Sequence, residues 1–188
     1  MNLVEPIRSK KQLEAMKKVL KGQSLRDYLL FMVGISSALR ISDILKLKVS
    51  DVWDGKKCHS HIRLREQKTK KNKGFPITSN LEKAIKEYIS NDNYDMDDYL
   101  FQSRKGNNQS ITRQHAHLIL NKAAEEVGIK EPISTHSMRK TWGYWAFKSG
   151  YNLALIMEAL NHSSIANTKK YLGITQDELD DVYIGLNL

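Results

Sequence analysis

Residues that interrupt helices are scarce along this chain, and their scarcity limits its fold more than any other feature. The 188 residues include only three prolines and ten glycines. Proline breaks a helix interior and glycine weakens one. Apolar residues also recur at the helical spacing of three to four positions in most segments. The sequence therefore predicts a mainly helical protein.

The helix boundaries are predicted from capping residues. A serine or threonine at the start accepts hydrogen bonds from the first turn, and a glycine after the last turn permits the left-handed conformation that ends a helix. Ser24 is predicted to cap the second helix and Ser42 the third. The predicted helices cover 9–21, the segment from Ser24 past Val33, the segment after Arg40, 81–89, 112–127, 135–149, 153–160 and 165–172.

The period changes to two after His59. Apolar Ile62 and Leu64 alternate with charged neighbours, a pattern typical of a strand with one buried face. A lysine-rich turn that ends at Gly74 leads to a second strand predicted at 75–78. The predicted fold is therefore α+β: mainly α with a small antiparallel β-sheet, formed by a hairpin with a basic tip.

The charge balance predicts a polyanionic partner. Lys and Arg total 30 against 21 Asp and Glu, a formal net charge of +9. The excess is not confined to one amphipathic helix, which favours nucleic acid over a membrane surface. No apolar stretch approaches the roughly 18 residues of a membrane span. A single cysteine, Cys58, excludes an internal disulfide framework and fits a reducing compartment. These features predict a cytoplasmic protein.

A metal or a nucleotide cofactor has no recognisable binding motif here. Cys58, His59 and His61 cluster, but on a strand Cys58 points away from both histidines, and no second ligand pair follows. No GxxxxGK[ST], GxGxxG or GxSxG motif occurs. The sequence predicts no metal and no cofactor.

Two motifs in the C-terminal half carry side chains suited to phosphate chemistry. His136 and Arg139 are three positions apart at the start of a predicted helix, so they share a face. His162 lies at a predicted helix junction, nine residues before Tyr171. Each motif alone is weak, since such a histidine can merely cap a helix and such a tyrosine can merely pack. Their conjunction is what indicates function.

Three segments resemble the signature boxes of the tyrosine recombinase (phage integrase) family: GISSALRISDILKLKVSDV, HSMRKTWGYWAF and ALNHSSIANTKKYL. They occur in the family's order and spacing, and the resemblance extends from about Ser24 to Tyr171. It implies the fold of a tyrosine recombinase catalytic core. It also implies a site-specific recombinase or integrase of a mobile genetic element, acting on double-stranded DNA without metal or ATP.

The resemblance further implies a role for each matching residue. Attack on a phosphodiester gathers negative charge on the phosphate oxygens, which arginine donors can stabilise. A tyrosine nucleophile has an ordinary pKa of about 10 and needs a base or a cationic environment. The implied roles are Tyr171 as nucleophile forming a 3′-phosphotyrosyl intermediate, Arg40, Arg139 and His162 as phosphate donors, Lys68 as general acid, His136 as base, and Asp43 as support for Arg40.

Which lysine of the basic hairpin acts as the general acid is left open. Lys70, Lys71 and Lys73 lie on the same turn as Lys68 and offer alternative registers for it. The hairpin is also predicted to contact DNA phosphates, through Arg63, Arg65, Lys70, Lys71 and Lys73.

The chain is predicted to form one catalytic domain, 1–174, followed by an amphipathic tail, 175–188. Family members usually carry a further N-terminal DNA-binding domain, but only about 23 residues precede the first signature helix, so a stand-alone catalytic domain or an excised piece is expected. The tail could pack on its own domain or on a neighbouring protomer. The resemblance implies a free monomer and a homotetramer on DNA. The tail's apolar stripe is Leu179, Val182, Tyr183 and Leu186.

Two other functions fit parts of the pattern. A non-enzymatic DNA-binding regulator that kept the fold is expected to have lost Arg40, Arg139 or Tyr171, and all three are present. A type IB topoisomerase relaxes DNA as a monomer, whereas the amphipathic tail favours assembly.

Overall fold

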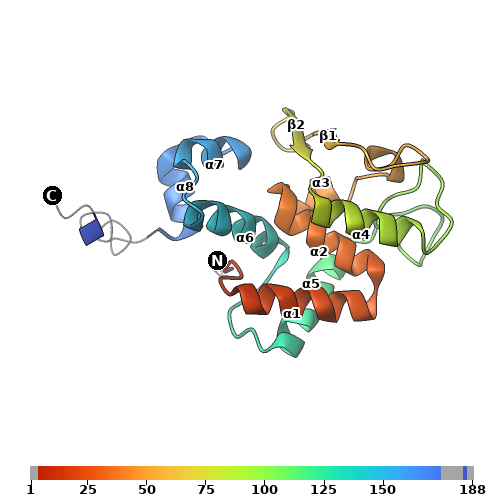
Figure 1. Cartoon of the computed structure of the whole chain (residues 1–188), viewed down its shortest axis with the longest axis horizontal. Coiled ribbons are helices and arrows are strands. Elements are labelled where there is room, and N and C mark those ends of the chain that lie inside the picture. The colour runs from red at the N-terminus through yellow and green to blue at the C-terminus, as the bar shows by residue number, and fades with distance from the viewer. Residues whose placement is uncertain (1–3, 175–183, 186–188) are drawn as a thin grey trace. The chain divides into compact units, whose positions relative to one another are not determined.

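A computed structural model describes residues 4–174 and 184–185 of the chain. The chain divides into two compact units, Met1–Trp142 and Gly143–Leu188, and helix α6 crosses the boundary. The described residues are mainly helical with one two-stranded antiparallel sheet (Figure 1), which confirms the predicted fold class. None of the helices described is both long and apolar enough to cross a membrane.

The first unit is built around helix α2, whose two sides are both covered. Helix α2 packs against α1 and α4, and α1 also packs against α5 (Figure 1). Because neighbours flank it, α2 buries six consecutive residues from Leu29 to Gly34. The elements of this unit are α1 (Lys10–Gln23), α2 (Leu25–Ser37), α3 (Ile41–Ile44), a 3₁₀ turn η1 (Val49–Asp51), β1 (His61–Arg65), β2 (Asn72–Pro76), α4 (Ser79–Ile89), α5 (Arg113–Val127) and the first part of α6 (Thr135–Lys148).

Side-chain caps start several of these helices. The Ser24 hydroxyl accepts from the Asp27 backbone N–H at 3.4 Å, so the predicted cap of the second helix is confirmed. The prediction of Ser42 as the third cap is wrong, because Arg40 occupies the N-cap of α3 and Ser42 lies inside that helix. The reason lies at Ala38, whose φ of 53° ends α2 in the left-handed region. Three residues later the chain enters α3 at Ile41, whose side chain is buried.

The hairpin forms, but its second strand begins earlier than predicted. Strand β2 starts at Asn72 rather than Phe75, because it pairs along the whole of β1, from His61 opposite Pro76 to Arg65 opposite Asn72. Ile62 and Phe75 face each other across the ladder and are both buried. The inner face of the hairpin thus joins the core of the first unit.

The second unit contains the end of α6, α7 (Leu153–Ala159) and α8 (Ile165–Leu172). Helices α7 and α8 pack together, and Leu172 closes against α6 at Gly143, where a Cβ would lie 2.7 Å from the leucine side chain. The predicted limits of α8 are confirmed. The tail stripe of Leu179, Val182, Tyr183 and Leu186 lies outside the described residues.

Candidate active site

The turn after α2 is the centre of the candidate site in the first unit. The carbonyl oxygen of Ala38 accepts a hydrogen bond from the Arg139 guanidinium and a second from Lys73 Nζ at 3.3 Å. Helix α6 supplies Arg139 and strand β2 supplies Lys73. One backbone oxygen therefore accepts hydrogen bonds from two cationic side chains that lie far apart in the sequence.

Close packing between α2 and α6 positions Arg139. A Cβ at Gly34 would clash with the Met138 side chain, so the glycine lets the start of α6 approach α2. Ser134 begins this helix: its hydroxyl accepts from the His136 backbone N–H at 3.1 Å. Arg139 is consequently buried, with 3% of its surface exposed.

Arg40 is held by a buried carboxylate. Its Nη1 lies 3.1 Å from Glu66 Oε1, and the Glu66 side chain is fully buried while 17% of the Arg40 side chain is exposed. The hydroxyl of Thr69 donates to the other Glu66 oxygen at 2.6 Å. Since both oxygens of Glu66 have a partner in the protein, the carboxylate is fixed and holds the arginine in turn.

Asp43, predicted to support Arg40, is bound to the hairpin turn. Its Oδ1 accepts from the Gln67 backbone N–H at 2.9 Å, and the Gln67 amide donates to the Ser42 carbonyl at 2.7 Å. Asp43 therefore ties α3 to the residue that precedes Lys68.

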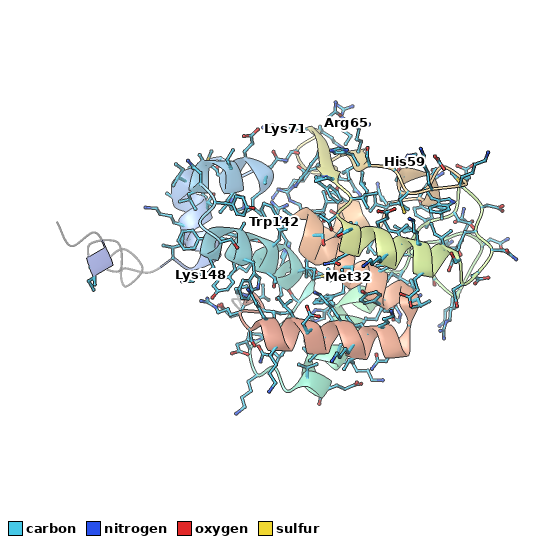
Figure 2. All side chains as sticks on the ribbon, viewed as in Figure 1. Met32, His59, Arg65, Lys71, Trp142 and Lys148 are labelled. Carbon is cyan, nitrogen blue, oxygen red and sulfur yellow. The ribbon has the colours of Figure 1, made fainter. Side chains whose placement is uncertain are left out.

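The cations of the hairpin fall into two groups. Lys68 and four of the five predicted DNA contacts are exposed, and Figure 2 shows Arg65 and Lys71 at the outer end of the hairpin. The Lys70 carbonyl accepts from Arg65 Nε at 2.8 Å, which steadies this turn. Lys73 differs, because its side chain is partly buried and reaches Ala38. The exposed predicted contacts are Arg63, Arg65, Lys70 and Lys71.

Burial, together with the surrounding positive charge, lowers the pKa of two groups. Burial, followed by the positive charge of Arg139, lowers the pKa of Lys73 to about 8. Partial burial also lowers the pKa of the His136 imidazole below its ordinary value, and Arg113, Arg139, Arg40 and Lys140 lower it further. A histidine with a lowered pKa is neutral at pH 7 and can accept a proton.

The second unit brings the other two candidate residues together. The rings of His162 and Tyr171 meet edge to face, with centroids 4.8 Å apart and planes at 80°. His162 Nδ1 lies 3.1 Å from the hydroxyl oxygen of Thr168, a buried residue of α8. The imidazole is therefore fixed next to the tyrosine by one hydrogen bond and one ring contact.

Sequence reasoning missed Glu66 and gave Lys73 a surface role. A signal for both exists in the period of two: Glu66 continues the inward series of Ile62 and Leu64, and Lys73 lies two residues before buried Phe75. A charged residue on the inner face of a strand needs a buried partner. That pattern could have indicated an ion-pair site.

A sequence model of the phage integrase family matches residues 8–178. The chain belongs to this family. The match extends over parts of both units and includes every candidate residue, which confirms the predicted resemblance to this family. Curated relatives are named tyrosine recombinases, and the chain is an enzyme of this class.

Two curated relatives illustrate the relationship. The "Probable integrase/recombinase YoeC" of Bacillus subtilis is 40% identical over 185 residues, which is 97% of each chain. The "Tyrosine recombinase XerD" of Listeria monocytogenes is 29% identical over 168 residues, which is 85% of this chain and 54% of the relative. The chain thus spans nearly all of one relative and about half of the other.

Solved structures support the fold. A crystal structure of XerA recombinase matches 98% of this chain and 66% of its own, with a TM-score of 0.77 at 21% identity. The Tn1549 transposon integrase in complex with transposon right-end DNA matches with a TM-score of 0.68 at 19% identity, covering 97% of this chain and 66% of its own. At such identities the likeness concerns the fold alone.

Proposed function

We propose that this protein is a site-specific DNA recombinase that cleaves one strand of a duplex through Tyr171 and joins it to a partner duplex. The observation that carries the proposal is the convergence of Arg40, Arg139 and Lys73 near one turn, with His136 in the same field of charge. Permanent cations on a rigid turn suit a phosphodiester. That the two units act on the same phosphate is inferred from family membership.

The chemical step divides among these groups. The Tyr171 oxygen attacks the phosphorus, the bond to the 5′ oxygen breaks, and the phosphate becomes a 3′-phosphotyrosyl ester. Arg40 and Arg139 donate to the phosphate oxygens as negative charge develops there, and His162 is the third donor. The energy of the broken ester is kept in the new one, so a second DNA end can reverse the step.

Proton transfer requires a base and an acid. His136, neutral at pH 7 because its pKa is lowered, is the base that takes the tyrosine proton. Lys68, exposed on the hairpin turn beside Gln67, is the general acid for the 5′ oxygen, in keeping with the family resemblance.

The partner proposed is double-stranded DNA. Two structural neighbours were solved with their substrates: XerH recombinase bound to palindromic difH, and the Tn1549 transposon integrase in complex with transposon right-end DNA. We also propose that four protomers assemble on two DNA sites. Because the proposed reaction acts on the cell's DNA, the proposed location is the cytoplasm.

The proposal is tested with nicked duplexes that tile the DNA flanking the coding sequence. A nick near the cleavage point lets the released strand diffuse away, so the covalent protein–DNA adduct accumulates. The expected result is an adduct on a small subset of duplexes, visible as a shifted band in a denaturing gel. Tight binding without an adduct on any duplex would instead support a DNA-binding regulator.

Protonation of His136 is expected to lower the rate of adduct formation at acid pH. The rate should be constant through pH 7 and fall only below His136's ordinary pKa of about 6.5, as the imidazole gains a proton. His136→Gln should lower the rate by about 10²–10⁴-fold and remove the acid limit. Single-turnover rates between about pH 5 and 8 measure both effects. An unchanged acid limit in the variant would assign it to another group.

The exposed hairpin cations are expected to set part of the salt dependence of DNA binding. Three or four phosphate contacts by this element contribute a slope of about −3 to −4 in log K against log salt. Lys70→Gln combined with Lys71→Gln should reduce the slope's magnitude by about 1.8. Lys83→Gln, an exposed lysine on α4, is the matched control and should leave the slope unchanged. An unaltered slope in the double variant would remove the hairpin from the DNA interface.

A further inference from the structure

Lys73 lies at a partly buried position of β2, where burial disfavours a charged side chain. It shares the inner face of β2 with buried Phe75, whereas Lys70 and Lys71 on the same hairpin are exposed. The register fixes it opposite Leu64, and its Nζ donates to the Ala38 carbonyl at 3.3 Å. The side chain is thus anchored on a strand and directed into the turn that also receives Arg139.

The charged groups around Lys73 come from three segments. Positive charge comes from Arg139 on α6 and from Arg40 at the start of α3, and negative charge comes from Glu66 after β1 and Asp43 on α3. The cluster thus has one more positive than negative group in its formal charge. Burial and the Arg139 guanidinium lower the pKa of Lys73 to about 8, so the ammonium is disfavoured yet still largely charged at pH 7.

The two guanidinium groups beside the partly buried Lys73 disfavour its ammonium, and a further anion would relieve that repulsion. Local arrangements that cost stability are expected at functional sites. An anion held by Arg40 and Arg139 would also meet the Lys73 ammonium, because Lys73 and Arg139 bind the same carbonyl oxygen. The surplus positive charge of the cluster matches a phosphodiester.

Resting on the proposed recombinase function, we propose that Lys73 is a third cation of the scissile-phosphate site and that loss of its proton sets the alkaline limit of DNA cleavage. Lys68 keeps its separate role as general acid at the turn. The sign follows from the charge: the ammonium is present below about pH 8 and disappears as the pH rises further.

The first test measures adduct formation on the flanking nicked duplexes from pH 6.5 to 9 for the wild type and Lys73→Met. The wild-type rate should fall above about pH 8, and the variant should be at least tenfold slower at pH 7 with no fall in that range. An alkaline limit that persists in Lys73→Met contradicts the proposal. Lys83→Met, on the exposed face of α4, should keep the wild-type profile.

Misfolding is separated from loss of charge by thermal unfolding. Replacing a partly buried charge that burial disfavours with an apolar side chain of similar length should raise Tm by about 2–4 °C at pH 7. A higher Tm together with slower cleavage supports a role in phosphate binding. A lower Tm with cleavage reduced in proportion to the folded fraction means that Lys73 is structural, and it overturns the proposal.

The second test does not depend on DNA cleavage. Inorganic sulfate, whose charge is constant over this pH range, is titrated into the full chain and followed by the side-chain NMR signals of the arginines. Sulfate should bind about tenfold more weakly to Lys73→Met than to the wild type at pH 7. Equal affinity overturns the inference even if the protein cleaves DNA. Weaker binding without any adduct supports the inference and counts against the recombinase proposal alone.

Discussion

Tyr171→Phe is expected to abolish the covalent protein–DNA adduct while leaving duplex affinity nearly unchanged. The phenylalanine ring keeps the edge-to-face contact with His162, so α8 stays in place. The variant lacks only the hydroxyl. A single hydrogen bond from that hydroxyl to DNA would contribute only about 0.5–1.5 kcal/mol to the binding free energy. A denaturing gel measures the adduct, and a mobility shift measures binding to the same duplex.

Tyr151→Phe is the matched control, because Tyr151 lies in the same unit and is 64% exposed. It should form the adduct at the wild-type rate. An adduct that survives in Tyr171→Phe would assign the nucleophile to another residue.

Arg40→Ala is expected to slow adduct formation by about 10²–10³-fold, the effect of removing one donor from a charged transition state. It should also destabilise the protein by about 3–5 kcal/mol, because Glu66 remains as a buried charge without its arginine. Denaturant unfolding measures the second effect, and single-turnover cleavage measures the first.

The double variant Arg40→Ala with Glu66→Gln separates the two effects. Neutralising the buried carboxylate should recover most of the lost stability, because the amide can still accept from Thr69. Cleavage should remain as slow as in Arg40→Ala. Recovery of cleavage along with stability would show that Arg40 is a structural residue and not a phosphate donor.

Most of the fold could be predicted from local patterns. The amphipathic periods and the cap at Ser24 depend on neighbouring residues only, and the corresponding helices occur where expected. Errors arose where the chain reverses. The helix after Arg40 occurs where expected, but its cap does not: the backbone at Ala38 adopts a left-handed conformation without a glycine, so nothing local indicated that Arg40 rather than Ser42 would occupy the N-cap of α3. The start of β2 depended on pairing with β1, which is a property of two segments together.

The candidate site was predicted residue by residue through the family resemblance, not through its contacts. Tyr171, Arg139 and His136 stand in recognisable motifs. The ion pair of Arg40 with Glu66 and the shared carbonyl of Ala38 join residues up to 101 positions apart, which no local pattern encodes. Lys73 was grouped with the surface lysines by its charge, although the period of two puts it on the same face of the strand as buried Phe75.

The central claim is that Tyr171 forms a covalent bond to DNA. The most direct measurement is to isolate the adduct, digest both the protein and the DNA, and identify the modified peptide by mass spectrometry. The result expected is a nucleotide joined through a 3′ phosphate to Tyr171, in the peptide that follows Lys170. A nucleotide on any other residue, or a 5′ linkage, would contradict the account.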